Sequence, residues 1–141
     1  MKKLCLIAAL AAFSAAPAFA ANTITIGMTV SKTGPLNVDS VSQLRGSELW
    51  RDEVNAKGGI KVGGKHYKVR FVEYDDQSQG GRVQQLYTRL VLQDKSQFLF
   101  SPYSSGLVAT AAVISEQYGK IMLIGGGAEG KTYELGNKYL F

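Results

Sequence analysis

The chain has 141 residues, with 16 basic and 11 acidic side chains and a net charge of +5. Its basic residues are scattered and form no run that would suit a nucleic-acid surface. The length matches one domain with a sizeable core, and the sequence contains no internal repeat and no low-complexity tract. A single cysteine, Cys5, and a single histidine, His66, argue against a disulfide framework and against a zinc site.

Residues 1–20 have the pattern of an export signal. Two lysines supply a positive start, residues 4–13 form an apolar run, and the Ala-Phe-Ala triplet at 18–20 is a small-x-small cleavage site. The apolar run is well short of the ~20 residues that a membrane span requires. We therefore expect cleavage after Ala20 and a periplasmic protein whose mature chain has no cysteine and depends on core packing alone.

The next part of the sequence predicts a strand, a helix and a hairpin. Residues 23–30 are rich in β-branched side chains, and Gly34-Pro35 ends this first strand. Residues 41–57 are typical of a helix, which Gly58-Gly59 terminates. A second Gly-Gly pair then predicts a tight turn into an alternating strand at residues 67–74, because glycine tolerates the positive φ of such turns.

The remaining sequence continues the alternation of helices and strands. A second helix is the clearest element, because apolar side chains recur at i, i+3, i+4, i+7 and i+8 from Val83. Residues 98–100 form a short apolar strand, and Ser104 or Ser105 is placed to cap a third helix. Residues 121–124 predict a fourth apolar strand, and the last three residues begin a fifth.

This order of elements indicates βαβ units and an α/β fold, a three-layer αβα domain with a parallel, Rossmann-like sheet. Short, continuous apolar strands fit a sheet that is buried on both faces. The right-handed crossover rule places the first strand between the second and the third. Ligands of such sheets bind beyond the carboxyl ends of the strands. This rule selects four loops as candidate sites, at residues 31–39, 75–79, 101–105 and 125–131.

Three segments carry a resemblance to a known family. They are TGP at 33–35, NAKGGI at 55–60 and EYDD at 73–76. In order and spacing, residues 23–141 resemble the type I periplasmic binding proteins, specifically the branched-chain amino acid-binding group that serves ABC importers. The resemblance implies a Venus-flytrap fold of two lobes joined by a hinge, of which residues 21–141 would form most of the first lobe.

The same resemblance implies a binding protein and not an enzyme. Its partners would be an amino acid or a similar small polar ligand and a membrane ABC permease, with no cofactor, no metal and no nucleic acid. The implied ligand contacts are Ser104 and Ser105 at the start of the third helix, and Gly127, Ala128 and Glu129 in the loop after the fourth strand.

The implied contacts differ in how well they suit an amino acid ligand. A hydroxyl and free backbone N–H groups at the helix start suit a ligand carboxylate, although Ser104 can equally be a plain helix cap. Glu129 departs from the family pattern. A carboxylate at this position can pair with an ammonium group but repels a nearby ligand carboxylate, so the assignment of an amino acid ligand stays open.

Other interpretations compete with a binding protein. Residues 125–132, GGGAEGKT, match the P-loop pattern of nucleotide hydrolases and follow an apolar strand. However, only three residues follow before Gly136, which is too few for the helix that a P-loop opens. Asp75 and Asp76 are possible catalytic carboxylates, but their position favours loop caps, and the spacing of a calcium loop is missing. A ligand-sensing receptor domain of the same fold is a further alternative.

Overall fold

The structure, a computed structural model, describes residues 22–127, 129–134 and 136–141. The expected export signal and Ala128 lie outside the described residues. The strands are β1 (Thr23–Val30), β2 (Ile60–Val62), β3 (Lys65–Asp75), β4 (Phe98–Phe100) and β5 (Met122–Leu123). The helices are α1 (Asn37–Ala56), α2 (Gly80–Leu92), α3 (Ser105–Tyr118) and α4 (Lys131–Glu134). None of the described helices is both long and apolar enough to cross a membrane.

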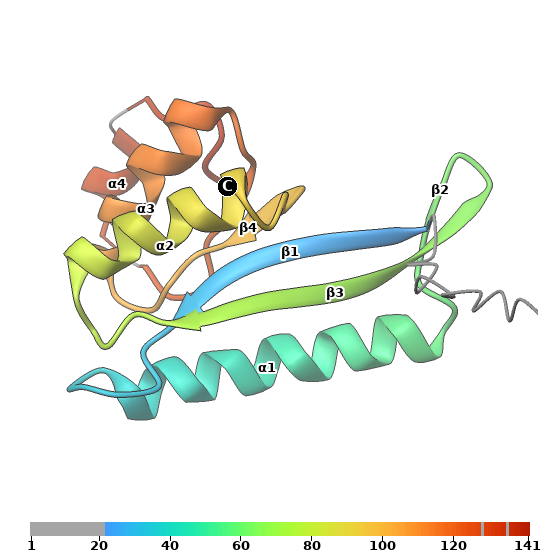
Figure 1. Cartoon of the computed structure of the whole chain (residues 1–141), viewed down its shortest axis with the longest axis horizontal. Coiled ribbons are helices and arrows are strands. Elements are labelled where there is room, and N and C mark those ends of the chain that lie inside the picture. Colours follow the sequence, from blue (N-terminus) through green and yellow to red (C-terminus); the bar gives the residue numbers. More distant parts are fainter. Residues whose placement is uncertain (1–21, 128, 135) are drawn as a thin grey trace, which may run out of the picture.

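The strands form one sheet in the order β2-β3-β1-β4-β5 (Figure 1). β1 pairs in parallel with β3 on one side and with β4 on the other, and β4 pairs in parallel with β5. This confirms the predicted central place of the first strand. The expected tight turn is also present, because β2 and β3 form an antiparallel hairpin at the sheet edge.

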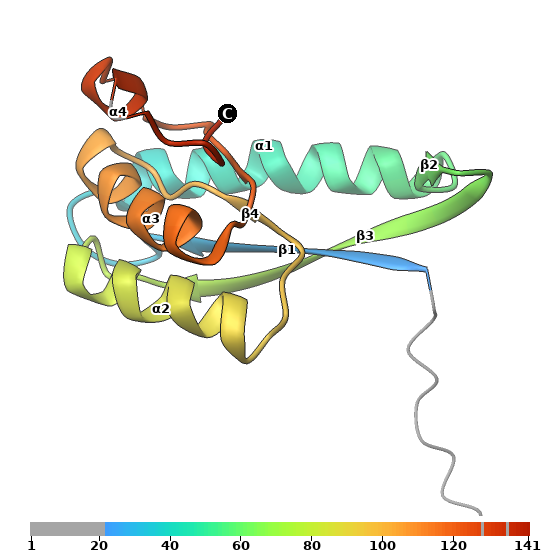
Figure 2. The same ribbon diagram turned by 90° about the horizontal axis from the view of Figure 1, so that it is seen from above.

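Helices cover both faces of the sheet. α1 runs along one face, and α2 and α3 lie on the opposite face (Figure 2). The connections from β1 to β3 and from β3 to β4 run in opposite directions across the sheet. Right-handed crossovers therefore place their helices on opposite sides. The result is the predicted three-layer αβα arrangement.

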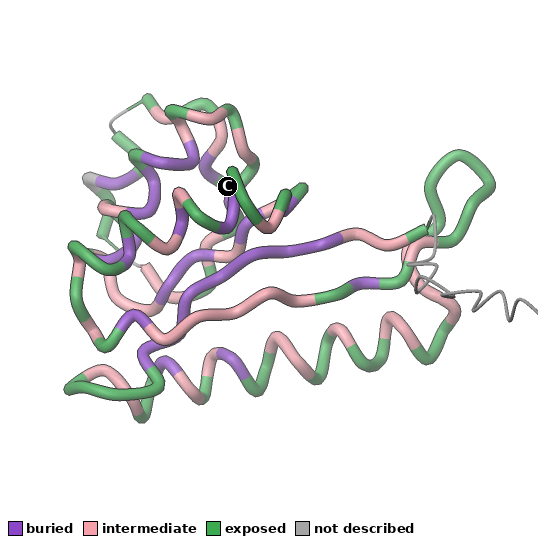
Figure 3. The backbone as a smooth tube through the Cα atoms, in the orientation of Figure 1, coloured by how far each residue is buried: buried purple, intermediate pink, exposed green. Residues whose placement is uncertain are grey.

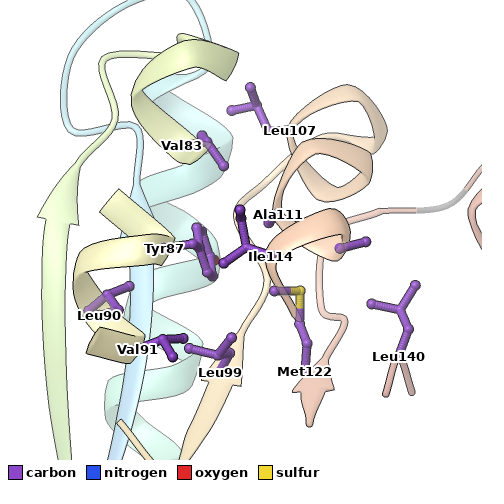
Figure 4. Close-up of a cluster of buried hydrophobic side chains, with 11 residues drawn as sticks. Val83, Tyr87, Leu90, Val91, Leu99, Leu107, Ala111, Ile114, Met122 and Leu140 are labelled. Atoms are coloured by element: carbon purple, nitrogen blue, oxygen red, sulfur yellow. The ribbon is translucent and has the colours of Figure 1, made fainter. Parts of the chain in front are cut away.

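The main core lies between the sheet and the α2–α3 layer (Figure 4). It follows from the periodic apolar face of α2, where Val83, Tyr87 and Leu90 are fully buried. Tyr87 donates its hydroxyl to the carbonyl of Phe100 at 2.5 Å. Burial raises the pKa of Tyr87 above its ordinary value, so this donor stays protonated at physiological pH.

The face of the sheet beneath α1 is less completely buried (Figure 3). Leu44 is buried there with Met28 and Val30 of β1. Further along the helix, Trp50 stacks on Phe71 with ring centroids 6.5 Å apart and keeps 38% of its surface exposed. α1 therefore packs on the β1–β3 side of the sheet through a narrow apolar stripe.

The NAKGG segment forms the corner between α1 and the hairpin. The side chain of Asn55 donates to the carbonyl of Val69 and accepts from the Val69 N–H, both at 2.8 Å. Gly58 and Gly59 have φ of +103° and +98°, in the region that side chains disfavour. A Cβ on Gly59 would lie 2.3 Å from the carbonyl oxygen of Tyr67. The motif thus forms a structural corner that leaves no room for a side chain at position 59.

Some boundaries differ from the expected ones. α1 begins at Asn37, four residues before the expected start, and its N-terminal flanking residue Leu36 makes no side-chain cap. The expected fourth strand is shorter, because β5 contains only Met122 and Leu123. The expected fifth strand is a single parallel bridge between Met122 and Leu140. Without a capping side chain at Leu36, no local signal marked the early start of the helix.

Candidate ligand-binding site

The four parallel strands all end at the same edge of the sheet, where Figure 1 shows the arrowheads of β1 and β3 side by side. The loops at this edge comprise residues 31–36, 76–79, 101–104 and 124–130. These are the loops that the topology selected, although the first is shortened by the early start of α1 and the bounds of the other three differ by one residue. They join into two pairs through hydrogen bonds.

The loops after β4 and β5 form the first pair. The backbone N–H of Ser104 donates to the carbonyl of Gly126 at 3.1 Å. The N–H of Gly125 donates to the hydroxyl of Ser101 at 3.2 Å. These bonds place the Ser104 and Gly127 loops, two of the four loops that the topology selected, next to each other.

Ser104 is the N-cap of α3, as predicted. Its hydroxyl accepts from the N–H of Leu107 at 3.5 Å, which is a long and weak bond. Its backbone has φ +79° and ψ +141°, a conformation that costs a residue other than glycine on the order of 1–3 kcal/mol. In this conformation its N–H points to the carbonyl of Gly126. Ser105, the first residue of α3, lies beside it and is half-buried.

Gly127 lies directly against α3. A Cβ at this position would stand 2.8 Å from a methyl group of Val108, so only glycine lets the loop approach the helix this closely. The carbonyl of Gly127 accepts a long hydrogen bond from the hydroxyl of Tyr133 at 3.4 Å. Glu129 is exposed, and its carbonyl accepts from the N–H of Thr132 at the start of α4. Its side chain is thus on the surface of the loop.

The loops after β1 and β3 form the second pair, and Asp76 joins them. Asp76 is fully buried. Its carboxylate accepts from the hydroxyls of Thr29 at 2.7 Å and Ser31 at 2.6 Å, and from the N–H of Ser78 at 2.9 Å. These bonds leave the carboxylate occupied within the protein, which favours the interpretation as a loop cap over a catalytic acid.

Asp75 also joins the loops after β1 and β3, and it does so closer to the surface than Asp76. It accepts from the N–H groups of Lys32 and Gln77, and from both the N–H and the hydroxyl of Thr33. Partial burial acts to raise the pKa of Asp75, but these hydrogen bonds outweigh it and hold the pKa below the ordinary value. Asp75 therefore stays ionised at physiological pH. Together the two aspartates join the two loops before any ligand arrives.

Gln43 also holds the loops after β4 and β5 together, and the sequence interpretation missed this residue. From α1 it donates its side-chain N–H to the carbonyl of Ser101 at 3.0 Å. Its side-chain oxygen is buried without a hydrogen-bond partner among the described residues and lies 2.2 Å from the position of a Cβ on Gly126. Gln43 thus links α1 to both loops of the first pair. No motif marks it, because its partners lie far away in the sequence.

This contact predicts a coupled effect of two substitutions. Gly126→Ala would collide with the Gln43 oxygen and approach Tyr103 to 3.0 Å. We expect it to destabilise the chain by about 1–3 kcal/mol, the usual cost of overpacking. In a Gln43→Ala background most of this cost should disappear, because the collision is with that side chain. Urea unfolding of the single and double variants measures the coupling.

Gly81→Ala is the matched control, because a Cβ at Gly81 meets no atom within 4 Å. It should be neutral or slightly stabilising, since alanine is the better helix former. Equal costs of Gly126→Ala with and without Gln43 would contradict the proposed contact.

The competing sites find little support in this geometry. α4, which follows the P-loop-like segment, has only four residues, whereas a P-loop opens a substantial helix. Among the described residues, no three His, Cys, Asp or Glu side chains are grouped to hold a metal ion. His66 is exposed in the hairpin.

A model of the family described as periplasmic binding protein matches residues 23–141. The chain belongs to this family. The resemblance inferred from the sequence is therefore confirmed. The periplasmic binding proteins are binding proteins located outside the cytoplasm, and the sheet with flanking helices matches one lobe of their fold.

Relatives with known names or structures agree with this assignment. The Leu/Ile/Val-binding protein homolog 7 of Brucella abortus is 31% identical over 119 residues, which are 84% of this chain and 29% of the relative. The branched-chain amino acid transporter substrate binding protein LivJ of Streptococcus pneumoniae, in complex with isoleucine, is 28% identical with a TM-score of 0.77. The match covers 85% of this chain and 33% of that protein.

A more distant structure shares the fold. The solute binding protein of an ABC transporter from Rhodopseudomonas palustris, in complex with 3,4-dihydroxy benzoic acid, is 18% identical with a TM-score of 0.69. The match covers 84% of this chain and 31% of that protein. The chain thus spans about one third of the length of these relatives.

Proposed function

We propose that residues 21–141 form the first lobe of a solute-binding protein that captures a small polar ligand for an ABC importer. The observation that carries this proposal is the joining of the Ser104 and Gly127 loops at the carboxyl edge of a family sheet. Ligands of open α/β sheets bind at this edge. Ser104, Ser105, Gly127, Ala128 and Glu129 are the proposed ligand contacts from this lobe.

The ligand class follows from the chemistry of the two elements. The start of α3 offers backbone N–H groups, the weakly held hydroxyl of Ser104 and the positive end of the helix dipole, all of which suit a carboxylate. The ligands named for the two solved relatives, isoleucine and a dihydroxybenzoic acid, both carry one. Exposed Glu129 suits an ammonium group. An amino acid fits both ends of the site, and an acid without an ammonium group fits only the first.

In the complete protein, the second lobe would close over this edge about a hinge. Closure removes water from the cleft, and a lower local dielectric strengthens the few polar contacts. The closed form would then be recognised by a membrane permease. Export and cleavage after Ala20 would place the protein in the periplasm. A receptor that senses the ligand is the alternative for the same lobe, and the site itself performs no reaction.

Ligand binding by a protein with both lobes tests the site. Ser104→Ala should weaken a carboxylate ligand by about 1–2 kcal/mol, the scale of one charge-assisted hydrogen bond. Glu129→Gln should weaken a ligand with an ammonium group and spare one without it. Isothermal titration calorimetry with an amino acid and with its deaminated analogue separates the two effects.

Thr110→Ala is a matched control on the same helix. The hydroxyl of Thr110 donates to the carbonyl of Gly106, away from the loop pair, so its loss should leave affinity unchanged. If Ser104→Ala and Glu129→Gln behave like this control for every ligand tried, the two residues are only a helix cap and a loop surface.

A further inference from the structure

The hairpin of β2 and β3 concentrates positive charge. Residues 54–72 include five basic side chains and no acidic one, whereas residues 21–53 and 73–141 together have nine basic and 11 acidic side chains. Basic residues that are spaced out along the sequence are thus brought together by the fold. We call this region, residues 57–70, the basic hairpin. Its five basic residues are all exposed: Lys57, Lys61, Lys65, Lys68 and Arg70.

The charge of the basic hairpin is not neutralised by ion pairs with any described carboxylate. The four ion pairs among the described residues all lie outside residues 54–72. Lys68 donates to the backbone carbonyl of Asn55, and Arg70 donates to the hydroxyl of Thr25 at 3.1 Å. Both acceptors are neutral. The basic hairpin therefore presents a net positive charge to whatever approaches it.

The tip of the basic hairpin adds an exposed apolar side chain. Val62 is 55% exposed and lies between Lys61 and the turn at Gly63 and Gly64. A Cβ on either glycine would meet no atom within 4 Å, so the described residues leave the tip uncovered. Lys65 follows the turn and lies opposite Val62 in the hairpin. One apolar side chain is thus flanked by two cations at a projecting turn.

The basic hairpin also lies far from the candidate ligand site. β3 runs from the turn to the loop that carries Asp76, and its 11 residues separate the tip from the carboxyl edge of the sheet by roughly 35 Å (Figure 1). The burial colours show the tip as an exposed loop (Figure 3). A partner at the tip would therefore leave the ligand edge open, and this surface needs an explanation other than ligand binding.

We propose that the basic hairpin binds the surface of a membrane that contains anionic phospholipids. Lipid phosphates attract cations close to such a surface, and an apolar side chain beside the cations gains by entering the boundary between headgroups and acyl chains. The pairing of Val62 with Lys61 and Lys65 supplies both groups at one projecting point. This inference depends neither on the ligand nor on the proposed function.

The small size of the tip favours a lipid surface over a protein partner. A stable protein interface needs roughly 800 Å² from each side. β2 has only three residues, and a strand of that length spans roughly 10 Å. Contact with lipid needs no such area, because it depends on separate charges and on single inserted side chains.

A polarity-sensitive fluorophore at the tip tests the proposal. Val62→Cys carries the label, and Val113→Cys is the matched control, because Val113 is 58% exposed but lies on α3. Cys5, the single cysteine of the chain, is replaced by serine in both proteins so that each has one thiol. Vesicles of phosphatidylglycerol are compared with vesicles of phosphatidylcholine. Any affinity of residues 1–20 for lipid is common to both proteins, and each label reports only its own position.

With phosphatidylglycerol, the emission of the label at position 62 should shift to shorter wavelength, and that of the label at position 113 should not. Neither should shift with phosphatidylcholine. Lys61→Gln combined with Lys65→Gln should lower the equilibrium constant for contact between tip and lipid about 30-fold, because each basic residue near an anionic lipid surface contributes about 1 kcal/mol. Arg82→Gln combined with Lys138→Gln removes the same charge from exposed positions outside the hairpin and should leave this constant nearly unchanged.

Three results would overturn the proposal. The first is an equal shift at positions 62 and 113, or a shift at 62 that does not depend on the two lysines. The second is an unshifted label together with aggregation of the double lysine variant, since the lysines would then only protect the edge strand β2 from pairing. The third is a label that phosphatidylglycerol leaves unshifted but polyglutamate shifts, because the partner would then be an acidic protein.

Discussion

Asp76→Ala is expected to destabilise the chain by about 3–4 kcal/mol, the largest effect of any single side-chain truncation considered for this lobe. The substitution removes the acceptor of three hydrogen bonds at once. The hydroxyls of Thr29 and Ser31 are themselves buried, so they would lose their partner without gaining water. Urea denaturation followed by circular dichroism measures the loss.

Two further variants make this prediction specific. Asp76→Asn keeps the size and part of the acceptor capacity, so it should cost less than alanine. Asp39→Ala removes an exposed carboxylate in the first turn of α1, where only the helix dipole is affected, and should cost less than about 1 kcal/mol. If Asp76→Ala cost no more than Asp39→Ala, the buried carboxylate would not be what joins the two loops.

Gly59→Ala should cost about 2–4 kcal/mol, because two penalties combine. The first is the φ of +98°, and the second is the collision of the new methyl group with the carbonyl oxygen of Tyr67. The oxygen belongs to the backbone of β3, so it cannot rotate away. The corner between α1 and the hairpin would have to shift.

Gly63→Ala separates the two penalties. Gly63 also has a positive φ, +55°, but a Cβ there meets no atom within 4 Å. Its substitution should cost about 1–2 kcal/mol from the left-handed conformation alone. Chemical denaturation of both variants gives the difference. Equal costs would show that the contact with the Tyr67 oxygen relaxes without cost and that the corner between α1 and the hairpin is not tightly packed.

The fold was predictable because its signals are local. The apolar period of α2 and the Gly-Gly pairs at 58–59 and 63–64 each depend on a few neighbouring residues, and the handedness rule then sets the strand order. The predicted start of α1 was wrong because Leu36 gives no capping signal. A helix without a polar cap begins where tertiary packing places it, and that packing is not visible in a short window of sequence.

Only those features of the candidate site were predictable that follow from the sheet topology or from a local motif. The cap at Ser104 and the meeting of its loop with the Gly127 loop follow from the helix signal and the sheet edge. Gln43 was not predictable, because its bond to Ser101 joins residues 58 positions apart. Nor does a pattern of residue types report the positive φ of Ser104 or the bond of its N–H to Gly126, because that bond joins two separate loops.

The fastening of the first two loops by Asp75 and Asp76 has a consequence for how ligand preference can change. Because these bonds exist within the lobe, the entropy of ordering the loops is lost during folding and not again at each encounter with a ligand. Such a preorganised half-site can keep its shape while the residues facing it are exchanged. Under the proposed function, substitutions at Glu129, which is exposed and takes no part in these bonds, would change ligand preference without loosening the first two loops. Relatives with one architecture would then differ in ligand at little cost in stability.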